Sequence, residues 1–176
     1  MKPLFLVGYM GCGKSTIGRK LARTLHLEFV DTDHRIEERE GATVIDIFHY
    51  EGEERFRTIE REVLEEVVAT GQAAVVSTGG GLPAWGDNMA RMNEVGRTIY
   101  LKRSAENIAS RLSPYGRQKR PRLRGLNDEE LVIFMREDMA KRDPYYSQAV
   151  QVVACEGKSD EEIIREIIDF YLRINN

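Results

Sequence analysis

The sequence is poor in cysteine and lacks long apolar runs. Its two cysteines, Cys12 and Cys155, are too far apart for the close spacing of a metal-binding motif. This usage is typical of a chain with reduced thiols, so we expect a cytoplasmic protein. No apolar run approaches the length that spans a bilayer, and the first residues lack the basic and apolar regions of a signal peptide. We therefore expect no membrane partner.

The sequence also lacks an excess of basic charge. It carries 26 Lys and Arg against 29 Asp and Glu, for a formal net charge of -3 at pH 7. This balance gives no overall attraction to nucleic acid, so we expect none as a partner. The 176 residues, 41% hydrophobic and 31% charged, fit one globular domain rather than a disordered chain. We expect a single domain over residues 1–176 and, since nothing demands an oligomer, a monomer.

The most informative stretch reads GYMGCGKST and runs from Gly8 to Thr16. It follows a short apolar run at residues 4–7 and opens onto a segment with apolar residues at helical spacing. Strand, glycine-rich turn and helix together form a phosphate-binding loop. Glycines let backbone N–H groups approach phosphate oxygens, Lys14 adds a charge beside the β- and γ-phosphates, and the Ser15 hydroxyl is a ligand for Mg²⁺. The pattern predicts binding of ATP or GTP with magnesium. The nucleotide-binding residues we expect are Gly11, Cys12, Gly13, Lys14, Ser15 and Thr16.

Strand-like and helix-like segments alternate along the whole chain. Strands are expected at residues 4–7, 28–30, 74–77, 98–101 and 150–153. Capping patterns start helices at Thr43, Asp87 and Asn127, and the last of these helices is expected to end before Pro144. This alternation predicts an α/β fold, with a parallel sheet covered by helices on both faces and ligands at the carboxyl ends of the strands.

Two carboxylates, Asp31 and Asp33, come directly after the second expected strand. At the carboxyl end of a strand they are placed to divide the work between a magnesium-bound water and a substrate hydroxyl. The same residues also suit the start of the helix expected next, because aspartate is a favoured helix cap. The sequence alone leaves both roles open.

Three consecutive glycines, Gly79, Gly80 and Gly81, follow the third expected strand. They suit a place where the backbone approaches a ligand closely and its amides face an anion. A flexible turn would have the same composition, so the glycines alone do not decide between the two.

The run from residue 111 to residue 126 is basic and contains no acidic residue. A solvated loop or a nucleic-acid patch would have this composition. Because a phosphate loop occurs in the same chain, we favour a mobile lid whose arginines close over ATP phosphates. Its prolines and glycines favour a structured loop with hinges rather than a helix. The basic residues are Arg111, Arg117, Lys119, Arg120, Arg122 and Arg124.

The motifs keep a specific order and spacing. They are Gly8 to Thr16, Asp31-Thr32-Asp33, Gly52-Glu53-x-x-Phe56-Arg57, Gly79-Gly80-Gly81, Arg120-Pro121 and Arg142-x-Pro144-x-Tyr146. In this combination the chain closely resembles shikimate kinase over essentially its whole length. The resemblance implies a P-loop kinase fold like that of nucleoside monophosphate kinases, with a five-stranded parallel sheet, a substrate-binding region at about 32–60 and a mobile lid at about 112–126. It also implies transfer of the ATP γ-phosphoryl group to the 3-hydroxyl of shikimate, giving shikimate 3-phosphate and ADP, on the way to chorismate and the aromatic amino acids.

The resemblance implies a role for each matching side chain. Asp33 would contact the shikimate hydroxyls and position or deprotonate the attacking one. Arg57 and Arg142 would hold the shikimate carboxylate. Arg120 would swing in with the lid to the ATP phosphates, where Lys14 also acts.

The resemblance further implies that the amides around Gly79 to Gly81 border the substrate. Ser15 would ligate Mg²⁺, and Asp31 would act on the metal through water. One position departs from the pattern of the family: Arg122 stands where an apolar residue is expected soon after the proline. Arg122 therefore competes with Arg120 for the phosphate role.

Three other functions share parts of this pattern. Another small-molecule kinase, such as a gluconate or nucleoside monophosphate kinase, would have the phosphate loop and a lid, but we would not expect it to carry the other motifs as well. A nucleotide-dependent switch or GTPase would need a guanine-selecting Asn-Lys-x-Asp, and none occurs. A nucleic-acid-binding ATPase is disfavoured by the acidic balance and the single small domain.

Overall fold

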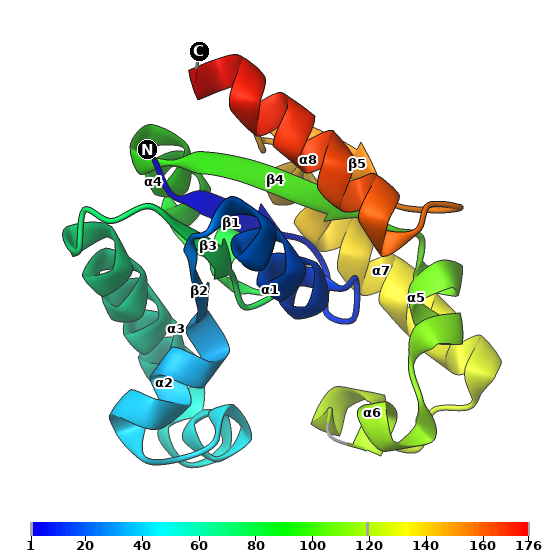
Figure 1. Ribbon diagram of the computed structural model, residues 1–176. Coiled ribbons are helices and arrows are strands. Elements are labelled where there is room, and N and C mark those ends of the chain that lie inside the picture. Colours follow the sequence, from blue (N-terminus) through cyan, green and yellow to red (C-terminus); the bar gives the residue numbers. More distant parts are fainter. Residues whose placement is uncertain (1, 119, 176) are drawn as a thin grey trace.

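A parallel sheet of five strands forms the centre of the protein in a computed structural model that describes residues 2–118 and 120–175 (Figure 1). The strands are β1 (Leu4–Val7), β2 (Glu28–Asp31), β3 (Ala74–Ser77), β4 (Arg97–Lys102) and β5 (Gln151–Ala154). Their order is β2-β3-β1-β4-β5, with every neighbouring pair parallel. The predicted five-stranded parallel sheet is confirmed. Because β1 has β3 on one side and β4 on the other, the strand order reverses at β1, where an α/β sheet typically binds its ligand.

Helices cover both faces of the sheet. In Figure 1, α1 and α8 lie in front of the strands and contact each other, whereas α4 and α7 lie behind. None of the helices within the described residues has the length and apolar character of a membrane span. The helices are α1 (Lys14–Leu25), α2 (Thr32–Glu40), α3 (Val44–Ala69), α4 (Asn88–Val95), α5 (Ala105–Arg111), α6 (Pro114–Gln118), α7 (Asp128–Tyr146) and α8 (Asp160–Asn175), with 3₁₀ turns η1 (Leu82–Ala84) and η2 (Pro121–Leu123).

Apolar side chains pack into one large core around the sheet and a smaller one under α2. Every residue of β1 and β3 is buried, as expected for strands without alternation between apolar and polar residues. The smaller core holds α2 against α3, and burial of an aliphatic or phenyl side chain contributes about 1.5–3 kcal/mol. It therefore fixes the part of α3 between Ile47 and Val63, where Arg57 lies. Its members are Ile36, Ile47, Phe56, Ile59 and Val63.

Gly52 divides α3 into two helical segments. Its φ of 85° and ψ of 169° lie outside the helical range, in a region that L side chains rarely adopt. Before it, the Thr43 hydroxyl accepts the Asp46 N–H at 3.1 Å, which confirms the predicted cap. After it, Phe56, Ile59 and Val63 recur at helical spacing and form an apolar stripe on the side that faces the core.

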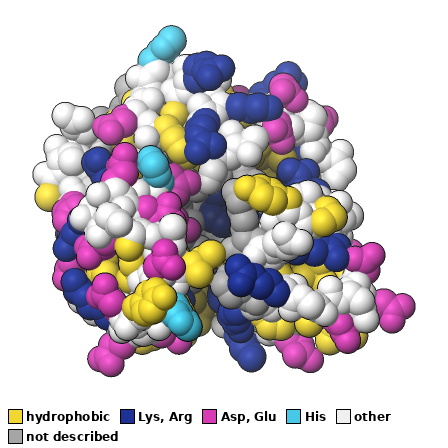
Figure 2. Space-filling view, turned by 90° about the horizontal axis from the view of Figure 1, so that it is seen from below, with side chains coloured by type: hydrophobic (Ala, Val, Ile, Leu, Met, Phe, Trp, Pro, Cys, Tyr) yellow, Lys and Arg dark blue, Asp and Glu magenta, His cyan; other side chains and the backbone are white. Residues whose placement is uncertain are grey.

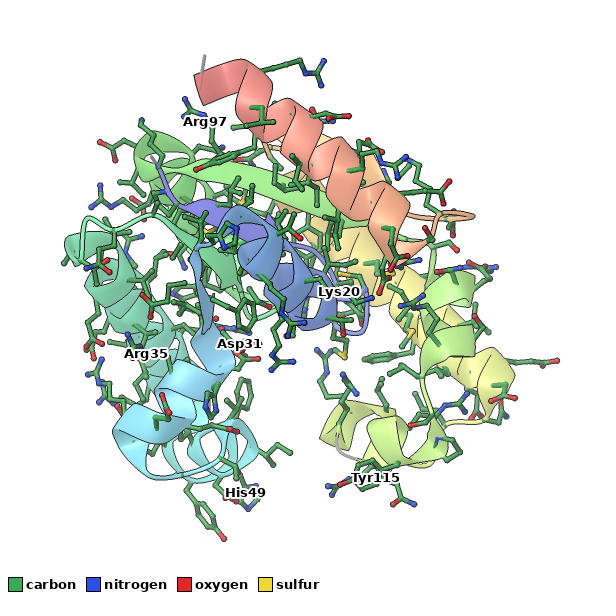
Figure 3. The ribbon with its side chains drawn as sticks, viewed as in Figure 1. Lys20, Asp31, Arg35, His49, Arg97 and Tyr115 are labelled. Carbon is green, nitrogen blue, oxygen red and sulfur yellow. The ribbon has the colours of Figure 1, made fainter. Side chains whose placement is uncertain are left out.

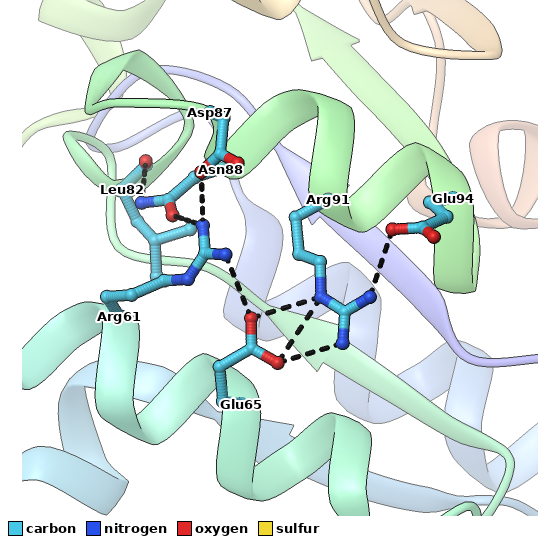
Figure 4. Close-up of polar contacts among 7 residues, drawn as sticks. All are labelled: Arg61, Glu65, Leu82, Asp87, Asn88, Arg91 and Glu94. Atoms are coloured by element: carbon cyan, nitrogen blue, oxygen red, sulfur yellow. Dashed lines mark hydrogen bonds and ion pairs between the residues drawn. The ribbon is translucent and has the colours of Figure 1, made fainter.

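Polar contacts join α3 to α4 and to the turn before it (Figure 4). Arg61 binds the Asp87 carboxylate at 2.6 Å, and Arg91 bridges Glu65 at 2.9 Å and Glu94 at 3.0 Å. Asp87 precedes α4 as predicted, but its side chain makes no capping hydrogen bond. Since α4 follows the triple glycine, these contacts hold that turn beside α3.

Two further expectations were wrong. Helix α7 continues through Pro144 to Tyr146, because a proline in the last turn removes only one backbone hydrogen bond. The lid was predicted to be a loop rather than a helix, but it contains the short helix α6 and the 3₁₀ turn η2. Pro114 stands at the first position of α6, where a missing N–H costs nothing, and the Ser113 hydroxyl accepts the Gly116 N–H at 3.0 Å.

Candidate active site

The loop between β1 and α1 has the backbone of a phosphate cradle. Gly8, Gly11 and Gly13 all have positive φ, of 145°, 78° and 103°. A Cβ on Gly8 would come within 2.9 Å of both the Cys12 sulfur and the Leu101 carbonyl oxygen, so glycine is required there. Gly13 caps α1 without any side-chain hydrogen bond. The first amides of α1 therefore remain for an anion.

The Lys14 ammonium is held at this loop by backbone oxygens. It donates to the Gly8 carbonyl at 2.8 Å and to the Tyr9 carbonyl at 3.1 Å. Cys12 lies buried under the loop, and its N–H donates to the same Tyr9 carbonyl at 3.2 Å. Lys14 thus lines a cavity that runs along the phosphate loop, whereas the Cys12 side chain is a small packing residue.

Asp31 caps helix α2 and also contacts the phosphate loop. Its Oδ1 atom accepts the N–H groups of Asp33 and His34 at 3.2 and 3.4 Å and so caps α2. Its Oδ2 atom accepts the Ser15 hydroxyl at 2.6 Å, and the Ser77 hydroxyl lies 3.2 Å from that of Ser15. Figure 3 shows Asp31 at the end of β2, beside α1. A hydroxyl and a carboxylate at this distance are the hard oxygen ligands that Mg²⁺ uses together with water.

The triple glycine is a place of close approach. A Cβ on Gly79 would lie 2.6 Å from Asp33 Oδ1 and 2.8 Å from Glu60 Oε1. A Cβ on Gly81 would overlap the Arg57 guanidinium. None of the three has a positive φ, so side-chain space, rather than backbone conformation, requires glycine here.

The Asp33 carboxyl is half-buried beside this turn. Burial, together with the charge of Asp31, raises its pKa to about 6, although Lys14 acts in the opposite direction. A carboxyl with this pKa is ionised at neutral pH and accepts a proton more readily than an exposed aspartate.

Arg57 is paired with Glu60, a residue that the sequence analysis did not single out. The Arg57 side chain is 11% exposed, and the Glu60 carboxylate beside it is buried. Burial raises the Glu60 pKa to about 7, opposed by the Arg57 charge. Glu60 follows Phe56 by four residues and precedes Val63 by three, so it lies on the apolar face of α3. A charge within an apolar stripe was the signal that would have found it.

Arg142 approaches the same turn from the other side. A Cβ on Gly80 would lie 3.5 Å from Arg142 Nη1, and the guanidinium carbon lies 5.4 Å from the centre of the Tyr9 ring. The Tyr146 hydroxyl donates to the Gly80 carbonyl. Arg57 and Arg142, which are far apart in the sequence, therefore flank adjacent glycines.

The two lid arginines occupy different places. Arg120 is half-buried and donates to the Gly116 carbonyl at 2.6 Å. Arg122 is exposed, with its Nη2 atom 3.6 Å from Asp138 Oδ1 and its guanidinium carbon 5.1 Å from the centre of the Phe134 ring. Arg120 lines the cavity at the phosphate loop, and Arg122 does not. Lys119, in the same basic run, lies outside the described residues.

Two neighbouring cavities share four residues. The first, of 610 Å³, lies along the phosphate loop and is lined by Lys14, Ser15, Thr16 and Asp31, among others. The second, of 1040 Å³, is lined by Arg57, Glu60, the triple glycine and Arg142. Figure 2 shows this face of the molecule, with a central hollow that has basic side chains within it and at its rim. The residues that line both cavities are Met10, Asp33, Gly80 and Arg120.

This chain is similar to a set of named proteins over nearly its full length. A family model described as shikimate kinase matches residues 10–172. The shikimate kinase of Parabacteroides distasonis is 44% identical over 174 residues, which are 99% of each chain.

Solved structures give the same result. The crystal structure of shikimate kinase from Bacteroides thetaiotaomicron aligns with a TM-score of 0.89 and 38% identity, over 97% of this chain and 98% of that one. A shikimate kinase from Acinetobacter baumannii in complex with shikimate aligns with a TM-score of 0.87 and 34% identity, over 98% of this chain and 94% of that one.

Proposed function

Because this chain belongs to the shikimate kinase family, we propose that it binds ATP in the cavity at the phosphate loop and shikimate in the neighbouring one. The enzyme transfers the γ-phosphoryl group of ATP to the 3-hydroxyl of shikimate, which gives shikimate 3-phosphate and ADP. The observation that supports the placement of the two substrates is that Asp33 and Arg120 line both cavities. The reaction then takes place where the cavities meet.

The phosphate loop binds the nucleotide. Amides of Gly11, Gly13 and the first turn of α1 surround the phosphates, and Lys14 turns its ammonium from the two loop carbonyls to the β- and γ-phosphate oxygens. Phosphoryl transfer requires positioning and neutralisation of charge more than covalent help from the protein. The loop supplies both.

Ser15 and Asp31 are the residues that would hold Mg²⁺, Ser15 directly and Asp31 through water. Support comes from the 2.6 Å separation of the two oxygens and from the hydroxyl of Ser77 beside them. The metal, when bound, neutralises charge on the phosphate oxygens.

Asp33 acts on the acceptor. The 3-hydroxyl oxygen forms a bond to the γ-phosphorus as the bond from that phosphorus to the bridging oxygen of ADP breaks, and the hydroxyl proton passes to the Asp33 carboxylate. Arg120, which also lines both cavities, stabilises the charge of the transferred group. Closure of the lid excludes water and so favours transfer to shikimate over hydrolysis of ATP.

Arg57 and Arg142 bind the shikimate carboxylate beside the triple glycine. A planar guanidinium pairs with a carboxylate through two parallel hydrogen bonds, which fixes orientation as well as affinity. Glu60 holds Arg57 against Gly81 and is a positioning residue. Glycine at residues 79–81 leaves the space that these side chains occupy.

We expect the enzyme to act as a monomer in the cytoplasm, without a nucleic-acid or membrane partner. Two observations support this expectation: both cysteines are free and buried, and acidic residues balance basic ones.

Replacing Arg57 by alanine is expected to weaken shikimate binding about ten- to hundredfold, with little change in ATP affinity. A charge-assisted hydrogen bond contributes about 1.5–3 kcal/mol, and every 1.4 kcal/mol is about tenfold in affinity. Titration calorimetry with each substrate measures both affinities. Arg55→Ala is the matched control, because Arg55 lies on the same helix and pairs with Glu51 and Glu62 outside the site. Unchanged shikimate affinity in Arg57→Ala would remove the assigned role.

A further inference from the structure

A buried carboxylate, Asp138, connects three parts of the site. It lies on α7 and is 7% exposed. Its Oδ2 atom accepts the Tyr9 hydroxyl at 2.8 Å and lies 3.3 Å from Arg142 Nη2. Its Oδ1 atom lies 3.6 Å from Arg122 Nη2. Tyr9 of the phosphate loop, Arg142 of α7 and Arg122 of the lid therefore all contact the Asp138 side chain.

The position of Asp138 on α7 sets its relation to Arg142. It precedes Arg142 by four residues, so both side chains lie on the same face of the helix, and both line the larger cavity. Asp138 contacts one edge of the guanidinium, while the Tyr9 ring lies 5.4 Å from its central carbon. A free arginine side chain has about 2 kcal/mol of rotamer entropy to lose on binding, so an arginine held in advance binds its ligand more tightly.

The Tyr9 hydroxyl fixes the Asp138 carboxylate in turn. Burial and the neighbouring carboxylate raise the pKa of Tyr9 well above its usual value. The hydroxyl therefore stays protonated and donates a hydrogen bond to Asp138. A buried carboxylate needs such partners, because removing it from water is costly. Tyr9 and Asp138 are 129 residues apart in the sequence, and the contact joins the phosphate loop to the middle of α7.

We propose that Asp138 is a positioning residue for acceptor binding, which holds Arg142 in the orientation that receives the substrate carboxylate and meets Arg122 where the lid reaches α7. The proposal rests on the role of Arg142 proposed above. It assigns Arg122 to the acceptor side of the site and leaves the phosphates to Arg120. Lid closure and acceptor binding then depend on the same carboxylate.

The test is Asp138→Asn, measured by steady-state kinetics with shikimate and with its uncharged methyl ester. Asparagine keeps an oxygen for the Tyr9 hydroxyl but loses the charge-assisted contact with Arg142. We expect the KM for shikimate to rise about three- to tenfold, with kcat changed less than twofold. The KM for the ester should be the same in both proteins, because the ester does not use the Arg142 charge. Equal increases for acid and ester, or no increase for the acid, would overturn the proposal.

Asp143→Asn is the matched control. Asp143 also lies on α7 and also accepts a tyrosine hydroxyl, that of Tyr100 at 2.8 Å, but it lines neither cavity. Its replacement is expected to leave the KM for shikimate unchanged. A rise like that of Asp138→Asn would contradict the proposal, since loss of any acidic charge from α7 would then explain both.

Arg122→Gln tests the connection to the lid. Arg122 is exposed, so its pair with Asp138 is weak, and we expect an increase of about twofold in the KM for shikimate. In the double variant with Asp138→Asn, the KM should equal that of Asp138→Asn alone, because both changes remove the same contact. Fully additive effects would contradict the role of Arg122.

Arg142→Gln separates this proposal from the one it rests on. If Arg142→Gln does not raise the KM for shikimate, the proposed binding site is wrong. If Arg142→Gln raises it and Asp138→Asn does not, only the positioning role of Asp138 fails. Thermal unfolding of every variant shows whether the protein is folded under the conditions of the assay.

Discussion

Replacing Asp33 by asparagine is expected to lower kcat about 10²- to 10⁴-fold, the usual contribution of a general base. Asp33 lines both cavities, and we propose that the acceptor hydroxyl meets the transferred phosphoryl group beside it. Asparagine has nearly the same shape and still accepts a hydrogen bond, but it does not take up the hydroxyl proton. Because the phosphate loop is untouched, the affinity for ATP should change little.

Two measurements separate these effects. Shikimate-dependent release of ADP gives kcat, and calorimetric titration with ATP gives the nucleotide affinity. Asp169→Asn, on an exposed part of α8, controls for the chemical change itself. Near-normal turnover in Asp33→Asn would contradict the proposed role of Asp33. Loss of ATP binding would show that Asp33 acts in nucleotide binding rather than on the acceptor.

The raised pKa of Asp33 also sets a pH dependence. With a pKa of about 6 for Asp33 and about 7 for Glu60, kcat/KM for shikimate should begin to fall below pH 7 and fall steeply below pH 6. Stability changes in the opposite direction. Both folded-state pKa values exceed the ordinary values of 3.8 and 4.5, so the folded chain takes up these protons first, and the contribution of the two groups to stability rises as the pH falls from about 7. A flat kcat/KM profile down to pH 5 would contradict the assignment of Asp33.

Replacing Arg120 by alanine is expected to lower kcat by about 10³-fold, the lower end of the range for an arginine that stabilises charge in phosphoryl transfer. Arg120 is half-buried and lines both cavities. Its charge therefore acts where water is scarce and electrostatic effects are strong. Arg122→Ala should change kcat less than about threefold, because Arg122 lines only the larger cavity and faces Asp138.

The two variants are compared in the same assay at saturating ATP and shikimate. Arg120→Lys should recover little of the lost rate, because an ammonium does not reproduce the planar geometry of a guanidinium. If only Arg122→Ala slows phosphoryl transfer, the assignment of Arg120 to the phosphates is wrong and Arg122 takes its place.

The sequence predicted the strands and the class of fold because both depend on local patterns. Residues 4–7 and 74–77 are short apolar runs next to glycine-rich turns, and both are buried strands. The errors at Pro144 and in the lid have local causes as well. Proline was taken to exclude helix, although the first position and the last turn of a helix both tolerate it. The order of the strands could not be read from the sequence, because it depends on which segments meet in space.

The positions of the candidate site residues could be predicted where these residues belong to contiguous sequence motifs. The phosphate loop and the triple glycine lie directly after strands, so their place at the edge of the sheet follows from the fold. Glu60 and Asp138 were missed because each acts through a neighbour. The place of Glu60 within an apolar stripe indicates its burial but not its pairing with Arg57, and Asp138 meets Tyr9 only when α7 packs against the phosphate loop.

The most direct test of the account is the release of ADP by the purified protein with Mg²⁺ and ATP, in separate reactions with shikimate, gluconate, CMP, AMP or no acceptor. The account predicts strong stimulation by shikimate alone, because Arg57, Arg142 and Asp33, to which we assign the shikimate carboxylate and hydroxyl, line one cavity beside the phosphate loop. Equal or greater stimulation by gluconate or by a nucleotide, with none by shikimate, would contradict it.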